Sequence, residues 1–262
     1  MQSKIYRGKR SILVLGVFLL LSFAWYQPKK IKVYLIGDST MCLYDANRFP
    51  ITGWGMPFAN YFNSNVTIDN RAKGGRSTRT FLSENRWQPI ADSLQEGDYV
   101  LMQFGHNDEA KEPKYADRYT PVPDYKKNLI RFITETRNKK GIPVLITPVS
   151  RRSFDQAGNI KETHVEYSKA VYEIGEQLKV PVIDLDKKSR ELLQTYGPEN
   201  SKLLFMELQP GEEPNYPDGQ HDNTHFTNYG ARKLAEIVLA EIKRLHLGLA
   251  DDIVSPPVAT KK

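Results

Sequence analysis

The sequence predicts an α/β fold in which a five-stranded parallel sheet lies between two layers of helices. From residue 31 onward, short apolar runs alternate with amphipathic segments, the pattern of parallel strands joined by crossover helices. Neither an internal repeat nor a low-complexity linker divides the 262 residues. A composition of 40% hydrophobic and 26% charged residues is ordinary for a globular protein with a sizeable core. We therefore expect one doubly wound, three-layer domain.

The first 24 residues have the layout of a secretory signal peptide. A basic stretch ends at Arg10, and an apolar run over residues 12–25 follows it. This run is short for a membrane span, and the small residues Ser22 and Ala24 suit a cleavage site before Trp25. We expect residues 1–24 to be a signal peptide, with a signal anchor as the alternative. The protein is then secreted or periplasmic, with no stable membrane association after cleavage.

Charge and cysteine content exclude several classes of protein. The formal net charge is +6, but four of the 37 basic residues lie in the first ten, and without them 33 basic residues face 31 acidic ones. A balance of +2 gives no support to a nucleic-acid partner. Cys42 is the only cysteine, so an intrachain disulfide is excluded, and its position does not suit lipid attachment. The oligomeric state stays open.

The elements follow in order along residues 25–250, which we take as the folded domain. The expected strands are residues 32–36, 66–70, 98–104, 143–148 and 180–185. Three helices are expected from apolar positions on one face: Tyr125, Leu129, Phe132, Ile133 and Thr136 in the first, Tyr167, Val171, Ile174 and Leu178 in the second, and Leu234, Ile237, Val238, Ile242 and Leu245 in the last. Residues 251–262 are expected to form a loose tail.

Two long polar stretches, residues 109–123 and 209–227, are expected to be irregular loops. Loops of this length in a compact domain are usually functional or mobile. In open parallel sheets, ligands bind at the carboxyl ends of the strands. The residues expected there are Gly37-Asp38-Ser39 after the first strand, residues 71–77 after the second and Gly105-His106-Asn107-Asp108 after the third. Taken alone, Gly-Asp-Ser is also a common turn composition.

Ser39 requires a base before it can act as a nucleophile. Of the five histidines, His164 and His246 are expected on polar, solvated helix faces, and His106 lies in a strand-end loop. His221 and His225 flank Asp222, and a single turn would place the Asp222 carboxylate beside the His225 imidazole. Such a pair supplies the base and its orienting group for acyl transfer to serine. The roles of His106 and His221 stay open.

An oxyanion hole is the second requirement of this chemistry. Candidate donors are the backbone N–H of Ser39, a backbone N–H in Gly74-Gly75 and the amide of Asn107. The alternatives are a tight turn at the glycines and a self-bonded loop residue at Asn107. His221, Asp222 and His225 could instead hold a metal, but no second acidic cluster accompanies them, which favours the metal-free interpretation.

Taken together, these blocks resemble the SGNH (GDSL-type) hydrolases. They are Gly37-Asp38-Ser39, the glycines of residues 72–77, Gly105-His106-Asn107-Asp108 and Asp222-Asn223-Thr224-His225, in the order and spacing of that superfamily. Within it, Gly74-Gly75-Arg76-Ser77 with Arg79, and Tyr216-Pro217-Asp218-Gly219 before Asp222, resemble the rhamnogalacturonan acetylesterases of carbohydrate esterase family twelve. Thr40 departs from the leucine that the GDSL pattern places after the serine.

The resemblance implies a flavodoxin-like fold and a serine esterase that needs no metal or other cofactor. It makes Ser39 the nucleophile, His225 the base and Asp222 its orienting group. The oxyanion hole would combine the N–H groups of Ser39 and Gly75 with the Asn107 amide; Gly75 is chosen because it directly precedes Arg76-Ser77.

The substrate implied by the resemblance is an acetylated polysaccharide of the plant cell wall, with the rhamnogalacturonan of pectin preferred. Lys73, Arg76 and Arg79 could attract its galacturonate carboxylates, or the arginines could instead brace loops. Trp54 and Tyr44 could stack on sugars, although most aromatic residues belong to the core. The alternatives are an acetylesterase for xylan or another glycan, a lysophospholipase-like esterase, and a glycan-binding module without catalysis.

Overall fold

The computed structural model describes residues 30–254, so the expected signal segment lies outside the described residues. The main sheet contains β1 (Ile31–Gly37), β2 (Val66–Asn70), β3 (Tyr99–Gln103), β4 (Ile142–Ile146) and β5 (Val182–Ile183). All its strands are parallel, in the order β2-β1-β3-β4-β5. This confirms the five-stranded parallel sheet, and the order is that of flavodoxin-like folds, with the switch point between β1 and β3.

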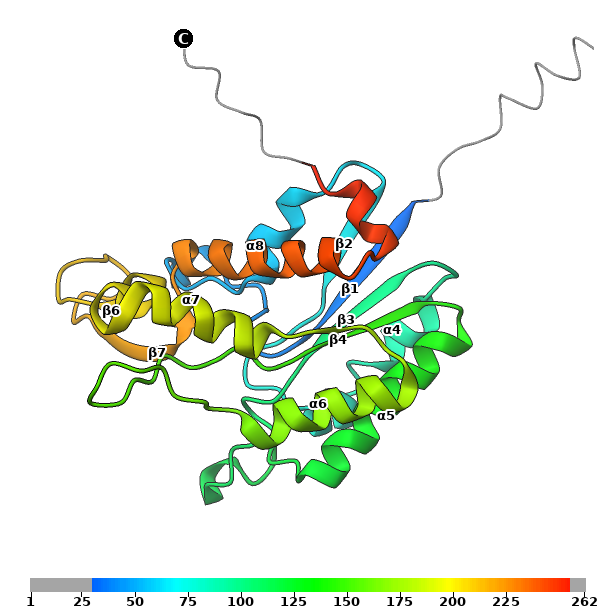
Figure 1. Cartoon of the computed structure of the whole chain (residues 1–262), viewed down its shortest axis with the longest axis horizontal. Coiled ribbons are helices and arrows are strands. Elements are labelled where there is room, and N and C mark those ends of the chain that lie inside the picture. Colours follow the sequence, from blue (N-terminus) through cyan, green and yellow to red (C-terminus); the bar gives the residue numbers. More distant parts are fainter. Residues whose placement is uncertain (1–29, 255–262) are drawn as a thin grey trace, which may run out of the picture. The chain divides into compact units, whose positions relative to one another are not determined.

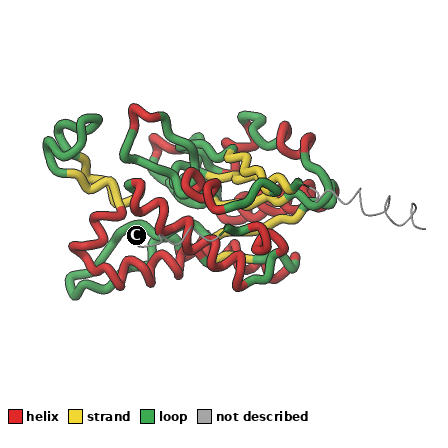
Figure 2. Tube along the Cα trace, turned by 90° about the horizontal axis from the view of Figure 1, so that it is seen from above, coloured by secondary structure: helices red, strands yellow, loops and turns green. Residues whose placement is uncertain are grey.

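Helices cover both faces of this sheet, as Figures 1 and 2 show. In chain order they are α2 (Gly55–Phe58), α3 (Thr78–Ser83), α4 (Gln88–Ser93), α5 (Val122–Asn138), α6 (Val165–Leu178), α7 (Leu185–Asn200) and α8 (Asn228–Arg244). Short 3-10 turns are η1 (Ala46–Arg48), η2 (Ala59–Tyr61), η3 (Pro113–Tyr115), η4 (Ser201–Leu204) and η5 (Gly248–Asp252). None of the helices within residues 30–254 is long and apolar enough to cross a bilayer.

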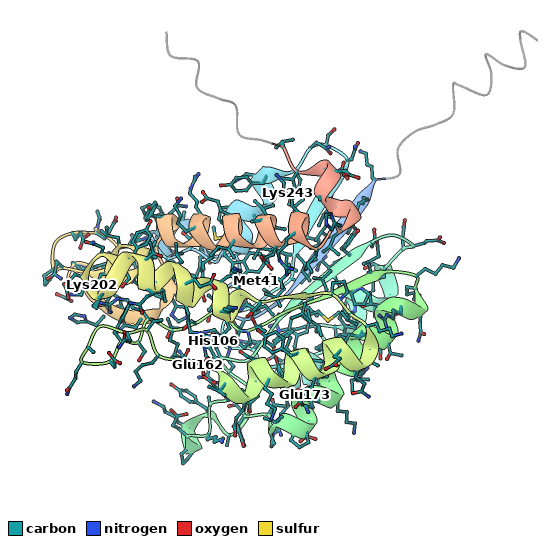
Figure 3. All side chains as sticks on the ribbon, in the orientation of Figure 1. Met41, His106, Glu162, Glu173, Lys202 and Lys243 are labelled. Carbon is teal, nitrogen blue, oxygen red and sulfur yellow. The ribbon has the colours of Figure 1, made fainter. Side chains whose placement is uncertain are left out.

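Alternate residues of the inner strands β1, β3 and β4 enter two different cores. Val33 and Leu35 of β1 pack with α2, α7 and α8, whereas Tyr34 and Ile36 pack with α4, α5 and α6. Figure 3 shows Met41 in the first of these layers, beneath α8. Because both faces are covered, the strands appear in the sequence as continuous apolar runs. The apolar faces predicted for α5, α6 and α8 all lie in these cores, which confirms them.

A hairpin outside the main sheet corrects one expectation. The predicted loop 209–227 contains β7 (Gln220–Phe226), which pairs antiparallel with β6 (Phe205–Leu208). Figure 2 shows this hairpin apart from the main sheet. β7 is polar and only partly buried, so it lacks the apolar run or strict alternation by which a strand is found in a sequence.

Two boundaries also differ from the prediction. The fifth strand was expected over residues 180–185, but Leu185 begins α7, because the Asp184 side chain caps that helix by accepting a hydrogen bond from Lys187 N. The start of the expected loose tail is fastened to the domain: Asp252 accepts hydrogen bonds from the side chains of Asn63 and Asn65. Residues 255–262 lie outside the described residues.

Candidate active site

Ser39 lies in a tight turn directly after β1, at the carboxyl edge of the sheet. Gly37 ends the strand against β3, where a Cβ would lie 2.4 Å from the carbonyl oxygen of Gln103. Only glycine fits that approach. The backbone N–H groups of Met41 and Cys42 then donate to Asp38 O, which closes the turn around Ser39.

A buried chain of hydrogen bonds fixes this turn. Asp38 Oδ1 accepts from Thr40 N (2.9 Å) and Thr40 Oγ1 (2.7 Å). Gln103 Nε2 donates to Thr40 Oγ1 (2.6 Å), and Gln103 Oε1 accepts from Trp54 Nε1 (2.6 Å). Burial raises the pKa of Asp38, but the nearby His106 and the bonds from Thr40 outweigh it, so the pKa lies below its usual range. The carboxylate therefore stays ionised and holds the turn.

Trp54 belongs to this chain and not to a sugar-binding surface. Its side chain is fully buried and packs edge-on against Phe58. The expectation that Trp54 contacts substrate is therefore wrong. Tyr44, the other aromatic residue considered, does line the cavity described below, and its hydroxyl donates to Ser39 O (2.9 Å).

His225 and Asp222 lie beside Ser39 although 186 positions separate Ser39 from His225. Ser39 Oγ is 2.8 Å from His225 Nε2, and His225 Nδ1 is 2.6 Å from Asp222 Oδ2. An ionised carboxylate can only accept, so the ring proton belongs on Nδ1, which leaves Nε2 free to accept the Ser39 hydroxyl proton. This is the geometry of a serine nucleophile, its base and an orienting carboxylate.

The turn expected to bring Asp222 beside His225 lies within a strand. Asp222 and His225 lie on β7, where Asp222 Oδ1 accepts from Thr224 N (2.8 Å) and His225 N (3.0 Å). The carboxylate itself thus shapes the turn that presents the imidazole. Burial raises the pKa of Asp222, but its hydrogen bond to His225 and these backbone donors lower it further, to below the usual range. Asp222 is therefore ionised at neutral pH.

The three residues that are expected to supply the oxyanion donors lie close together. A Cβ at Gly74 would lie 3.7 Å from Ser39 Cβ, so the glycine pair runs close to the serine, and Gly75 has a φ of 78°. Asn107 Nδ2 donates one of its hydrogens to Arg76 O (3.0 Å), which fixes the amide and leaves the second hydrogen for another acceptor. Gly75, Asn107 and Ser39 line one cavity.

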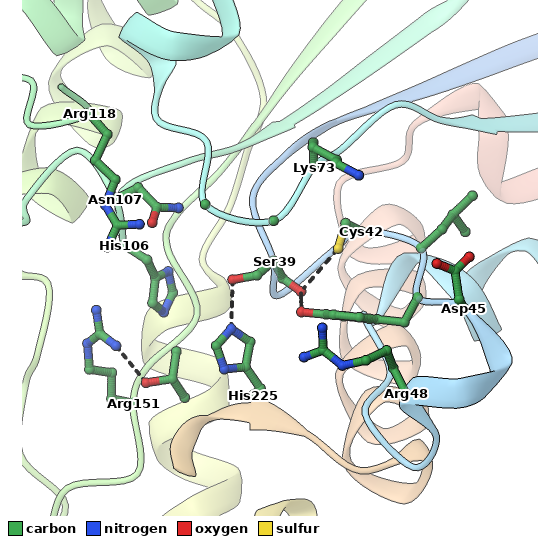
Figure 4. A pocket seen from close by; sticks show the side chains of 15 residues that line it. Ser39, Cys42, Asp45, Arg48, Lys73, His106, Asn107, Arg118, Arg151 and His225 are labelled. Atoms are coloured by element: carbon green, nitrogen blue, oxygen red, sulfur yellow. Dashed lines mark hydrogen bonds between the residues drawn. The ribbon is translucent and has the colours of Figure 1, made fainter. Parts of the chain in front are cut away.

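This cavity, of about 490 Å³, is rich in cations (Figure 4). Arg118 and Arg151 lie on one side of Ser39, and Lys73 and Arg48 lie on the other. The remaining lining residues are Cys42, Leu43, Tyr44, Asp45, Gly74, Gly75, His106, Asn107, Thr224 and His225. The lining therefore suits a polar or anionic ligand better than an apolar acyl chain.

The arginines singled out in the sequence are not part of this lining. Arg76 Nη1 donates to Gly74 O (2.9 Å) and its Nε pairs with Glu84 (3.0 Å), so it braces the glycine loop. Arg79 lies on α3, 3.9 Å from Asp124. Arg76 and Arg79 do not line this cavity, and their contact with substrate stays a prediction; Lys73 is the member of that group that lines it. Arg118 and Arg151 were missed because distant segments bring them to the site.

His106 and His164 form a buried pair behind Ser39. Their rings are 4.3 Å apart, His106 Nδ1 is 3.5 Å from Asp38 Oδ2, and His164 Nδ1 is 2.9 Å from Glu109 Oε2. Burial, with a smaller contribution from His164, lowers the pKa of His106 to about 4. The expectation that His164 is a solvated surface residue is wrong: it precedes α6 and is 1% exposed. His246 is exposed, as expected.

His221 does not join the site. Its side chain is 87% exposed, and its Nδ1 is 2.9 Å from Glu207 Oε2. Within residues 30–254 we find no cluster of three or more His, Cys, Asp or Glu residues arranged to hold a metal.

Comparison with known proteins identifies the family. The sequence matches the GDSL-like Lipase/Acylhydrolase family over residues 35–233. The chain belongs to this family. The resemblance seen in the sequence is thereby confirmed, and the chain is an ester-hydrolysing enzyme. The parallel sheet has the flavodoxin strand order and helices on both faces, which is the fold expected for a member of this family.

The match extends over nearly the whole length of two relatives from Bacillus subtilis (strain 168). The chain is 44% identical to rhamnogalacturonan acetylesterase RhgT over 227 residues, 87% of this chain and 96% of the relative. It is 34% identical to the probable rhamnogalacturonan acetylesterase YesY over 223 residues, 85% and 97% of the two chains.

Solved structures share the fold. The YxiM protein of Bacillus subtilis superposes with a TM-score of 0.72 at 26% identity, and the match covers 85% of this chain but only 59% of YxiM. The acetylxylan esterase Axe2 of Geobacillus stearothermophilus gives a TM-score of 0.59 at 19% identity, over 82% and 94% of the two chains. At that identity the likeness to Axe2 concerns the fold alone.

Proposed function

We propose that this esterase removes acetyl groups from rhamnogalacturonan, a pectin of the plant cell wall, through an acetyl-enzyme on Ser39. The observation that carries the proposal is the run of contacts from Ser39 Oγ to His225 Nε2 (2.8 Å) and from His225 Nδ1 to Asp222 (2.6 Å). Ser39 and His225 line a cavity whose basic side chains suit an acidic polymer. Similarity to RhgT supports the choice of substrate.

In the first half of the reaction, Ser39 Oγ attacks the acetyl carbonyl carbon while His225 Nε2 takes the hydroxyl proton. The negative charge on the carbonyl oxygen is stabilised by the N–H groups of Ser39 and Gly75 and by the Asn107 amide. The intermediate then collapses: the bond to the sugar oxygen breaks, and His225 returns its proton to that oxygen. Ionised Asp222 stabilises the His225 imidazolium between these steps.

In the second half, water attacks the acetyl group on Ser39. His225 takes a proton from the water, the same donors hold the oxyanion, and acetate leaves as Ser39 recovers its proton. Each step uses groups of this chain and water, so the proposed reaction has no step for a cofactor.

Export would bring the enzyme to a wall polymer. The basic and apolar segment over residues 1–24 predicts secretion or transfer to a periplasm, with a retained signal anchor as the alternative. Trp25 as the first residue of the exported protein, read by N-terminal sequencing, would agree with cleavage.

The proposal is tested by acetate release from a panel of substrates. Wild-type enzyme should release acetate faster from acetylated rhamnogalacturonan than from acetylated homogalacturonan or xylan. Ser39→Ala and His225→Ala should each lower kcat on p-nitrophenyl acetate by about four to six orders of magnitude, because nucleophile and base act as one unit. Circular dichroism should show that both variants remain folded.

Other outcomes point to the alternatives. A preference for xylan would reject the pectin assignment, and normal turnover in Ser39→Ala would reject the proposed nucleophile. Binding of pectin without hydrolysis of any ester would favour the glycan-binding module. A lysophospholipase-like activity would need a long apolar groove, which the charged lining around Ser39 does not offer.

A further inference from the structure

A second cavity adjoins the one that contains Ser39. It measures about 620 Å³ and shares three lining residues with the first, His106, Arg118 and Arg151. Its other walls come from the start of the long loop 109–123 and from the segment that leads into α6. Each cavity alone is large enough for a small ligand. A polymer whose acetylated sugar lies at Ser39 must continue beyond the first cavity, and the second offers space for the neighbouring sugar.

Arg118 stands on the boundary between the two cavities. Its guanidinium Cζ lies 3.7 Å from the centre of the Tyr115 ring, and Nη1 lies 3.7 Å from where a Cβ at Gly75 would be. Its Nε is buried without a hydrogen-bond partner, and no carboxylate in the described part of the chain lies within ion-pair distance of Arg118. Tyr115 thus holds the planar cation in place, while its Nη1 and Nη2 groups, which make no hydrogen bond within the described residues, are left available.

The other basic residues around the second cavity, Arg151 and Lys111, are already engaged. Arg151 donates to Thr224 Oγ1 (2.6 Å) and Glu109 Oε1 (3.3 Å), and Glu109 also binds His164. The remaining ion pairs are Lys111 with Glu166 at 3.7 Å and Glu162 with Arg190 at 3.2 Å. Glu112 is exposed. Arg118 is therefore the cation best placed to bind an anion from a ligand.

We propose that the second cavity receives the part of the polymer that continues beyond the acetylated sugar, and that Arg118, on the boundary between the two cavities, binds a uronate carboxylate of the polymer. The inference rests on the proposed function. A guanidinium presents two parallel N–H donors that match the two oxygens of a carboxylate. Its position beside Gly75 places this recognition close to the acetyl group without contact with the reacting atoms. Arg118 is thus a specificity-determining residue for uronate-containing polymers.

A cycle of variants and substrates tests this role. The substrates are acetylated rhamnogalacturonan oligosaccharides and the same oligosaccharides with their carboxyl groups reduced to alcohols. Arg118→Gln should lower kcat/KM for the charged oligosaccharides about tenfold or more beyond any loss on the reduced ones. Arg118→Lys, which keeps the charge but not the paired donors, should recover part of the loss. Arg79→Gln, an arginine outside both cavities, should change the two substrates alike.

An equal loss on charged and reduced substrates, or no loss on either, would overturn the role of Arg118. If the wild-type enzyme released no acetate from either oligosaccharide, the proposed function would fail by itself. The inference would then be decided by calorimetry with galacturonate oligomers on Ser39→Ala protein. Adding Arg118→Gln to the Ser39→Ala protein should raise the Kd for these oligomers about tenfold. An unchanged Kd would reject the subsite.

Discussion

Gln103 connects the serine turn to the hydrophobic core through both ends of its amide. It is fully buried, and it is the residue that satisfies both Trp54 Nε1 and Thr40 Oγ1. A buried polar group that loses its partner costs about 1–3 kcal/mol. Gln103 is therefore a positioning residue for Ser39, through Thr40 and Asp38.

Gln103→Leu should destabilise the protein and slow the reaction. The change leaves the indole N–H of Trp54 without an acceptor, so the free energy of unfolding in urea should fall by about 1–3 kcal/mol. Since the turn loses a support, kcat on p-nitrophenyl acetate should fall more than KM rises.

The matched control combines two changes. Trp54→Phe in the Gln103→Leu background removes the orphaned donor, so the double variant should be more stable than the two single losses added together. A Gln103→Leu protein with wild-type stability and kcat would contradict this role.

At this scale, the sequence revealed residues whose chemistry is local and missed those that act through distant neighbours. Ser39, Asp222 and His225 stood out because nucleophile, base and carboxylate are distinctive types in short blocks. The bond from Thr40 N to Asp38 spans two residues, a spacing readable as an Asx turn. Arg118 and Gln103 carry no such signal, because their partners lie on other segments.

The last long helix of the described residues, α8, fixes the strand that carries His225. α8 begins directly after β7, which carries His225, and Thr227 Oγ1 caps the helix by accepting from Gly230 N (3.2 Å). At Gly230 the helix touches the end of η4, where an added Cβ would lie 1.9 Å from Leu204 O. The position of His225 thus depends on a contact between two backbones.

Gly230→Ala should therefore lower both stability and activity. To relieve the clash, α8 must shift away from η4, and such overpacking typically costs about 1–3 kcal/mol. A lower Tm and a lower kcat should appear together, because the shift displaces β7. Gly248→Ala is the control, since a Cβ there would be 3.4 Å from its nearest neighbour, Tyr99 Oη. Equal Tm values for the two variants would contradict the expected clash.

The elements themselves were predictable to the extent that burial leaves a pattern. Strands covered on both faces and the helices α5, α6 and α8 were found within a few residues of their bounds, but α7, with 16 residues, was not predicted. β6 and β7 were missed, because β7 is polar and partly exposed, and its turn is set by hydrogen bonds to Asp222. Short helices such as α3 were also missed; α3 is fixed by a Ser77–Thr80 capping box.

Across the whole molecule, two buried groups make stability depend on pH in opposite directions. Burial lowers the pKa of His106 to about 4 from an ordinary value of 6.5. Between these values the unfolded chain binds a proton that the folded chain does not, so stability rises with pH. Burial raises the pKa of Asp108 from 3.8 to about 7. Between pH 3.8 and about 7, the folded chain keeps a proton that the unfolded chain has lost, so stability falls as pH rises.

Two variants should separate these contributions. Between pH 4 and 6.5, the slope of the unfolding free energy against pH should be lower for His106→Gln than for wild type, because the variant lacks the contribution that rises with pH. Between pH 4 and 7, this slope should be higher for Asp108→Asn than for wild type, because the variant lacks the contribution that falls with pH. Each difference should be on the order of 3 kcal/mol across its window, measured by urea unfolding at several pH values. Curves parallel to the wild type would contradict the assignment.

The three-layer fold followed from the alternation of apolar runs and helices, but the order of its strands did not. Because β3 pairs directly with β1 and not with β2, the loops after β1 and β3 lie side by side at the carboxyl edge of the sheet. Only this order brings Ser39 beside Asn107, which no local pattern can express.

The separation of Ser39 and His225 along the chain also sets when activity can arise during synthesis. The nucleophile leaves the ribosome early, but its base lies 186 residues later on a strand held by the last long helix, α8. A nascent chain that has not yet emerged beyond β7 holds a serine without a base. Ester hydrolysis is thus a property that the polypeptide acquires only after β7 and α8 have been translated, and its onset would report the completed fold.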